Sequence, residues 1–418
     1  MSSATKTKTP PVHVPHAFFN TGAPNGFLEV DGRPLNLLVE EAGGTPLFIY
    51  SRRAMAHRVE QLREAMPSAL HLHYAMKANP MPAVVGYMAG LVDGLDVASG
   101  AELRVALDAG MSAENISFAG PGKQVGELTQ AVAAGATINL ESEAEMRKVA
   151  AIAERLDCPG KVAIRVNPDF QLKGSGMKMG GGSQQFGVDA ERVPAMLREL
   201  ATLPLQFVGL HIYSGSQNLR ADAIIDAQSK TLALAAELAS HTPVPMQHVN
   251  IGGGLGIPYF PGETPLDLAA VGAALEQQLA SLPAVLQQTQ IVMELGRYLV
   301  GEAGLYVCRV VDRKISRGHP FLITDGGLHH QLAASGNFGQ VLRKNYPVLL
   351  ASRMHEQERE VQSVVGPLCT PLDLLGDRMA LAPADEGDLV AVLQSGAYGP
   401  TASPAAFLSH PSARQMLV

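Results

Sequence analysis

The feature that most constrains the fold is a regular alternation, from residue 46 to 300, of short apolar segments with longer amphipathic ones. Segments such as HLHYA at 71–75 and KVAIRVN at 161–167 are typical of buried strands, and ESEAEMRKVAAIAERL at 141–156 is typical of a helix. Strands that alternate with helices usually run parallel, so the pattern predicts an α/β fold. About eight such units close a (β/α)8 TIM-like barrel. An open doubly wound sheet is the alternative, because the count of units does not exclude it.

The chain changes character on both sides of this region. Residues 1–20 carry no apolar segment and are expected to form a flexible tail. Residues 21–45, including LNLLVEE, are expected to form strands that join a C-terminal β domain. Residues 301–418 contain β-branched and apolar runs with few helical periods, which predicts an antiparallel β domain. The expected organisation is therefore a barrel over 46–300 followed by this β domain.

Composition narrows the classes of partner. The net charge of -7 provides no basic face for nucleic acid, so a small ligand is expected. The three cysteines, Cys158, Cys308 and Cys369, are far apart and match neither a disulfide framework nor a zinc-site spacing, which favours a reducing cytoplasm. No apolar run approaches the roughly 18 residues that a membrane helix needs, and the N-terminus lacks a signal-peptide core.

Lys77 lies at the end of a predicted strand, in HYAMKANP. Barrel enzymes carry their reacting groups at such strand ends, and a lysine there is able to form a Schiff base with an aldehyde cofactor. For the lysine alone, an ordinary solvated side chain is the more common explanation. The surrounding residues favour the catalytic interpretation.

Two further strand ends carry residues suited to the same cofactor. In NIGGGLG, the glycines 252–254 allow backbone N–H groups to approach a phosphate, with a helix expected to follow directly, although such a run is often only a turn. In IVMELGR, Glu294 is able to keep a pyridine nitrogen protonated and Arg297 to contact the phosphate, although a salt-bridged strand end is common.

Three segments remain ambiguous by themselves. Cys369 in GPLCTPLD is either a reactive thiol or simply buried, and Tyr398 in SGAYG offers a hydroxyl on a glycine-flanked turn. The Gly-rich loop over 171–185 lacks the phosphate-loop spacing and is either a flexible connector or a lid that closes on substrate.

Taken together and in this order, the motifs YAMKAN, DVASGAE, HIYSGSQ, GGGLG, ELGR, GPLC and GAYG resemble the pyridoxal-phosphate-dependent ornithine and diaminopimelate decarboxylases. The resemblance covers about residues 25–410. It implies an alanine racemase-like barrel of fold type III with a C-terminal β domain, in a homodimer with shared active sites. It also implies a group IV carboxy-lyase of amino-acid metabolism, with pyridoxal 5'-phosphate as cofactor and a quinonoid intermediate.

The resemblance also implies residue roles. Lys77 is similar to the Schiff-base lysine, and Cys369 to the residue that reprotonates the product from the neighbouring subunit. The remaining residues implied to contact or surround the cofactor are Asp96, Arg165, Ser216, Gly252, Gly253, Gly254, Glu294, Arg297 and Tyr398. In the family a histidine stacks on the cofactor ring. A gapless alignment places Tyr213 there and His211 two residues earlier, so both are candidates.

One departure from the family bears on the substrate. Relatives carry an acidic residue directly after the cysteine, available for the distal ammonium of a diamino acid, whereas this chain has Thr370, with Asp373 later in the same loop. A cationic substrate end gains most from a charged acceptor, so its loss disfavours lysine, ornithine and diaminopimelate. GPLCTPLD is closer to decarboxylases of biosynthetic clusters, including those acting on glutamyl groups held on a carrier protein.

Three other functions compete with this interpretation. The first is a pyridoxal-phosphate racemase or epimerase, but racemases of related fold have arginine where Glu294 stands. The second is a non-catalytic homologue that regulates a decarboxylase by heterodimerisation, against which the retention of Lys77, Glu294, Cys369 and Tyr398 argues. A general phosphosugar barrel is the third.

Overall fold

The computed structural model describes residues 17–174, 176–338, 340 and 343–418, which form two compact units. The barrel unit comprises Met55–Ile257 and Leu266–Val300. The β unit comprises the chain up to Ala54 together with Pro258–Pro265 and Gly301–Val418. The expected tail over 1–20 lies outside the described residues except for its last four. No helix of the described residues is both long enough and apolar enough to cross a membrane.

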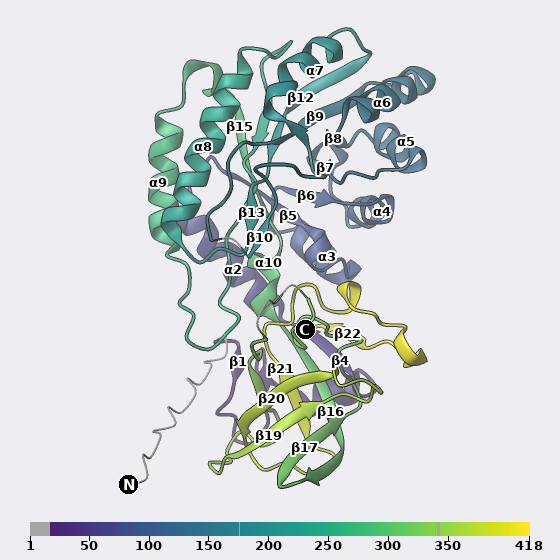
Figure 1. Cartoon of the computed structure of the whole chain (residues 1–418), viewed down its shortest axis with the longest axis vertical. Coiled ribbons are helices and arrows are strands. Elements are labelled where there is room, and N and C mark those ends of the chain that lie inside the picture. Colours follow the sequence, from purple (N-terminus) through teal and green to yellow (C-terminus); the bar gives the residue numbers. More distant parts are fainter. Residues whose placement is uncertain (1–16, 175, 339, 341–342) are drawn as a thin grey trace. The chain divides into compact units, whose positions relative to one another are not determined.

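Eight parallel strands close the barrel, which confirms the predicted (β/α)8 architecture over an open sheet (Figure 1). Their order is β9-β12-β14-β15-β5-β6-β7-β8, and β8 pairs with β9 to complete the circle. The strands are β5 (His71–Ala75), β6 (Gly94–Val97), β7 (Ile116–Phe118), β8 (Thr137–Leu140), β9 (Gly160–Asn167), β12 (Leu205–Ile212), β14 (His248–Asn250) and β15 (Gln290–Leu295). The short β11 (Val188–Asp189) is added beside β9.

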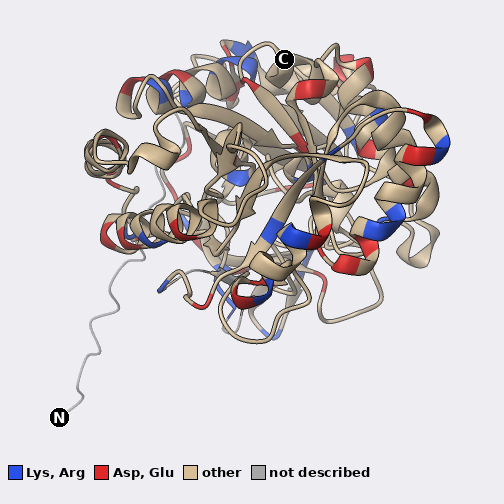
Figure 2. Cartoon of the chain, turned by 90° about the horizontal axis from the view of Figure 1, so that it is seen from above, with Lys and Arg blue, Asp and Glu red and all other residues tan. Residues whose placement is uncertain are grey.

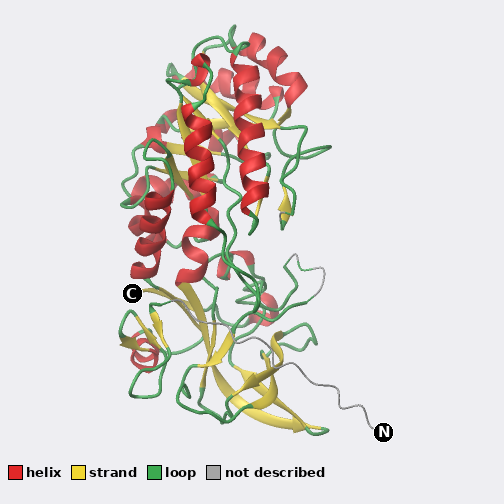
Figure 3. Ribbon diagram, turned by 90° about the vertical axis from the view of Figure 1, so that its left-hand side faces the viewer, coloured by secondary structure: helices red, strands yellow, loops and turns green. Residues whose placement is uncertain are grey.

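Helices cover the outside of the barrel (Figure 3). Their starts follow local sequence signals, because Ser99 and Ser142 each accept a hydrogen bond from the backbone N–H three residues later. Figure 2 shows charges of both signs interspersed on these outer helices. The helices are α2 (Arg52–Ala65), α3 (Pro82–Ala89), α4 (Gly100–Asp108), α5 (Val125–Ala134), α6 (Glu143–Leu156), α7 (Val193–Leu200), α8 (Ala221–Ala239), α9 (Leu268–Ala280) and α10 (Arg297–Val300).

The β unit is built around the long strand β16 (Gly304–Ser316), which pairs with β4, β17 and β21. The other strands are β4 (Leu47–Tyr50), β17 (His319–Thr324), β18 (Val348–Leu350), β19 (Glu360–Val365), β20 (Leu374–Leu381), β21 (Leu389–Val392) and β22 (Arg414–Leu417). The sheet is mixed rather than purely antiparallel as predicted, because β17 pairs with β19 and β22 pairs with β4 in parallel. Both pairs join strands that are distant in sequence, and such long connections permit parallel pairing.

The N-terminal segment differs from its prediction. Its strands β1 (Phe19–Asn20), β2 (Glu29–Val30) and β3 (Arg33–Pro34) form a separate small sheet, and the strand that joins β16 is β4, which we had expected in the barrel. LNLLVEE, predicted as a strand, is helix α1 (Leu35–Glu41), because Leu35, Leu38 and Val39 then share one buried face. This face packs in the same apolar core as β4 and β16.

Two helical glycines provide a test of barrel packing. A Cβ on Gly272 of α9 would lie 1.8 Å from the carbonyl oxygen of Ala65 at the end of α2, whereas one on the exposed Gly86 of α3 would meet nothing within 4 Å. We predict that Gly272→Ala lowers the free energy of unfolding by about 1–3 kcal/mol, because backbone must move. Gly86→Ala should raise it by about 0.5–1 kcal/mol. Urea unfolding measures both, and equal effects would contradict this packing.

Candidate active site

Lys77 and Glu294 meet where β5 and β15 end. The two strands are neighbours in the barrel with Glu294 opposite His73, and Lys77 lies in the single turn, Met76–Ala78, that follows β5. The Lys77 Nζ is 3.6 Å from Glu294 Oε1. Gly296 permits this approach, since a Cβ there would lie 2.9 Å from the Ala78 Cβ and 3.0 Å from the Ala75 carbonyl oxygen. The ELGR and YAMKAN motifs are therefore one structural feature.

The two members of this ion pair differ in exposure. The Glu294 side chain is 4% exposed and that of Lys77 is 44% exposed, so the carboxylate is enclosed and the amine is accessible. Burial opposes ionisation of Glu294, but the positive charge of Lys77 and the contact with His211 outweigh it, and the pKa of this carboxyl lies well below its usual range. Glu294 is thus a fixed negative charge inside the barrel at neutral pH.

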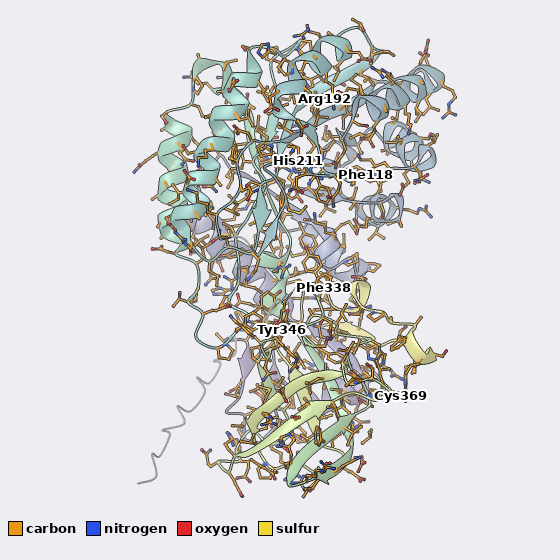
Figure 4. All side chains as sticks on the ribbon, in the orientation of Figure 1. Phe118, Arg192, His211, Phe338, Tyr346 and Cys369 are labelled. Atoms are coloured by element: carbon orange, nitrogen blue, oxygen red, sulfur yellow. The ribbon has the colours of Figure 1, made fainter. Side chains whose placement is uncertain are left out.

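His211 and Tyr213, the two candidates for a stacking ring, occupy different places. His211, labelled among the barrel strands in Figure 4, is buried with its Nε2 3.1 Å from Glu294 Oε2. This contact is short but not aligned as a hydrogen bond, so Oε2 has no hydrogen-bond partner among the described residues. Tyr213 is half-buried, and its ring centroid lies 5.7 Å from Lys77 Nζ.

The glycine run packs its backbone directly against the Glu294 strand. The Glu294 N–H donates to the Gly252 carbonyl at 2.9 Å, and a Cβ on Gly253 would lie 2.1 Å from the Glu294 carbonyl oxygen. Gly252 and Gly254 have φ angles of 71° and 90°, in the left-handed region that favours glycine. No side chain can therefore fill this corner, which leaves backbone groups to face a ligand.

The helix that the sequence predicted directly after these glycines is absent, and that prediction is wrong. The next helix is α9, which begins at Leu268. Pro258, Pro261 and Pro265 occupy the intervening segment, and a proline has no N–H to donate to a helix. A phosphate at the glycine run would be bound by backbone and side chains without a helix dipole.

Asp96 lies on β6 beside His73, a residue that the sequence analysis did not single out. His73 Nδ1 is 3.5 Å from Asp96 Oδ1, while Asp96 Oδ2 is buried without a hydrogen-bond partner among the described residues. Burial lowers the pKa of His73, but attraction by Asp96 and Glu294 outweighs it and the net shift is upward. The sequence offers only a positional signal for His73. It lies two residues before Ala75 in β5, so the two side chains project from the same face of the strand.

The structure also describes the other predicted residues of the barrel unit. Arg165 on β9 donates to Glu141 at 2.7 Å, and Arg297 begins α10 directly after β15. Ser216 lies on β13 (Gly215–Ser216), which pairs antiparallel with β10 (Met177–Lys178) of the Gly-rich loop. That loop is thus tied to the strand that carries Ser216.

The remaining predicted residues belong to the β unit, and their roles, like those of the barrel residues, stay predictions. Cys369, labelled in Figure 4, is exposed, and Tyr398 has a φ of 53°. The Thr370 Oγ1 accepts from the Leu372 N–H at 3.3 Å. Asp373 is 3% exposed, and its two oxygens accept from the N–H groups of Leu328 and Leu368, so it also holds two loops together.

The barrel site fits pyridoxal phosphate. An accessible lysine adjoins a buried ionised carboxylate, and buried oxygens of Glu294 and Asp96 lack hydrogen-bond partners among the described residues. The glycine run provides a corner without side chains for a phosphate. The accessible amine, the buried carboxylate and the backbone corner are the groups that would hold the aldehyde carbon, the pyridine nitrogen and the phosphate of this cofactor.

Comparison with known proteins identifies the family. Residues 52–301 match the family model of the pyridoxal-dependent decarboxylases, pyridoxal binding domain. The L-glutamyl-[BtrI acyl-carrier protein] decarboxylase of Niallia circulans is 38% identical, covering 89% of this chain and 88% of that protein. The diaminopimelate decarboxylase of Aquifex aeolicus is 33% identical, covering 94% and 91% respectively.

Solved structures agree with the sequence comparison. The diaminopimelate decarboxylase of M. jannaschii in complex with L-lysine superposes with a TM-score of 0.86 at 25% identity, covering 94% of this chain and 92% of that one. The chain therefore belongs to the pyridoxal-dependent decarboxylase family. It is a carboxy-lyase that uses pyridoxal phosphate and acts on an amino-acid or aminoacyl substrate.

We predict that the His73–Asp96 contact makes the stability of the cofactor-free protein depend on pH. Because the folded-state pKa of His73 is raised above the 6.5 of an unperturbed histidine, its contribution is fully present below about pH 6.5. That contribution is lost as the pH rises through the folded-state pKa. Asp96→Asn removes the attraction and should flatten this dependence, as urea unfolding between pH 6 and 9 would show. Identical pH slopes for the two proteins would refute this.

Proposed function

We propose that this enzyme decarboxylates an aminoacyl group held on a carrier protein, with a glutamyl group as the leading candidate. The observation that carries the proposal is Thr370, which stands directly after Cys369 where diamino-acid decarboxylases have an acidic residue. A neutral residue there leaves the distal ammonium of lysine, ornithine or diaminopimelate without a charged acceptor. The relative named for a glutamyl carrier-protein substrate, at 38% identity, supports the same choice.

The barrel residues would serve this reaction in distinct ways. Bound pyridoxal phosphate supplies an aldehyde carbon for the substrate amine and a ring that accepts the electron pair released with CO2. Lys77 presents an accessible amine, and Glu294, kept ionised, would accept a hydrogen bond from a protonated ring nitrogen. Gly252–Gly254, Ser216, Arg297 and Tyr398 are proposed to hold the phosphate. His211, in contact with Glu294, and Tyr213, nearer to Lys77, both stay candidates for the ring that would stack on the pyridine.

The proton that replaces CO2 on Cα is proposed to come from Cys369. Its thiol is exposed within one copy of the chain, which suits a group that acts in the site of a neighbouring copy. We therefore propose a homodimer with shared active sites, working in the cytoplasm. The free state of Cys158, Cys308 and Cys369 supports a reducing compartment.

A substrate panel tests the proposal. Cofactor-loaded enzyme is given glutamate, lysine, ornithine and diaminopimelate, and glutamyl and lysyl groups loaded on an acyl carrier protein, and CO2 release is scored for each. Turnover of a carrier-bound group well above every free amino acid supports the proposal. Highest turnover of a free diamino acid would overturn it, and racemisation without CO2 release would establish the epimerase alternative.

The role of Thr370 has its own prediction. Thr370→Glu restores a carboxylate next to Cys369 and should raise kcat/KM for a free diamino acid about tenfold or more, the size of effect that one charge-assisted hydrogen bond supplies. Thr370→Gln, similar in size to glutamate but neutral, is the matched control and should show no such gain. Equal values for the two variants would show that charge at this position does not select the substrate.

A further inference from the structure

A buried ion pair lies beside the cofactor site, and only one of its members has a role above. Glu141 follows β8, and its Oε1 accepts a hydrogen bond from Arg165 Nη1 at 2.7 Å. The side chains are enclosed, at 3% exposed for Glu141 and 8% for Arg165. Loss of either partner would leave the other charge buried and alone, which costs far more than loss of a surface pair.

The Glu141 carboxylate is fixed by two further donors. Its Oε1 also accepts from the Gly120 N–H at 2.7 Å, and its Oε2 accepts from the Gly187 N–H at 2.8 Å. Gly187 reaches this position because it has no side chain, since a Cβ there would lie 2.9 Å from the Arg165 carbonyl oxygen. The carboxylate therefore joins three separate segments, and their three hydrogen bonds fix its orientation.

A second buried pair holds the backbone of Glu141. Lys123, whose side chain is 1% exposed, donates from Nζ to both oxygens of Glu145 at 3.1 Å. Glu145 Oε2 in turn accepts from the Glu141 N–H at 2.8 Å. Lys123 also donates to the carbonyls of Gly120 and Asn139, so the whole group is internally connected.

Arg165 links this group to the cofactor site. In the pairing of β9 with β12, Arg165 is opposite His211, and residues opposite one another project from the same face of a sheet. His211 contacts Glu294, and Arg165 is one of the charges that act on Glu294. The electrostatic environment of Glu294 thus depends on the position of the Arg165 guanidinium and on how far Glu141 neutralises its charge.

We infer that Glu141 is a positioning residue of the cofactor pocket, which fixes Arg165 beside His211 and compensates its charge. The inference rests on the pyridoxal-phosphate site and is independent of which substrate the enzyme takes. Glu141 would thereby help to set the electrostatic environment of Glu294, in addition to any effect that it has on stability.

The test uses the cofactor-loaded enzyme and the variant Glu141→Gln, which keeps the shape of the side chain and removes its charge. We expect about tenfold weaker cofactor binding, as for loss of other groups that orient a ligand-binding residue. We also expect the pH midpoint of the cofactor absorbance to fall, because an uncompensated Arg165 opposes protonation nearby. Glu143→Gln, which breaks only the surface pair with Arg192, is the control and should change neither.

Two double-variant outcomes complete the test. Added to Arg165→Met, Glu141→Gln should cause no further shift of the midpoint, because its effect acts through the guanidinium. If Glu141→Gln alone fails to fold, the double variant should fold, since no charge is then buried alone. An unchanged midpoint in Glu141→Gln, an additive shift in the double variant, or misfolding of both would overturn the inference. Inactivity on carrier-bound substrates bears only on the proposed function.

Discussion

The close approach of the ends of β5 and β15 is the constraint on which the site depends. Gly296 allows the chain after Glu294 to pass against Ala75 and Ala78, and this brings the Lys77 amine to 3.6 Å from the carboxylate. The enclosed member of the pair is the acid and the accessible member is the base. This asymmetry suits pyridoxal phosphate, whose ring nitrogen the enclosed Glu294 would hold and whose aldehyde the accessible Lys77 would bind. A larger residue at 296 would separate the two groups without changing either.

The barrel interior is unusually polar for a packed core at this level. Polar side chains lie on six of the eight barrel strands or directly after them: the buried Asp96, Glu141, Arg165, His211 and Glu294, and the partly exposed His73. Isolated charges at such depth would destabilise the fold by several kcal/mol each, so their arrangement in opposite pairs is required for folding. The pairs lie toward the strand ends at which barrel enzymes carry their chemistry. The pairing of these charges is therefore needed both for the stability of the fold and for cofactor binding.

The sequence predicted the barrel well because its strands and helices have clear periods and each reacting group ends a strand. For the same reason it placed Lys77, Glu294 and the glycine run at strand ends, where the structure also has them. It misassigned α1, whose apolar positions fit both a short strand and one helical face until packing partners are known. Parallel pairs such as β4 with β22 join residues more than 360 positions apart, which no local pattern reveals. His73 and Glu141 were missed because their significance comes from Asp96 and Arg165, which lie on other strands.

The central claim is that the Lys77 amine, held next to Glu294, is the group that carries the cofactor. Borohydride reduction of the cofactor-loaded enzyme, followed by digestion and mass spectrometry, tests it most directly. We expect one phosphopyridoxyl mass addition per chain, on the peptide that contains Lys77, and none in Lys77→Ala. A protein that binds the cofactor but is labelled at another lysine, or at none, would contradict it.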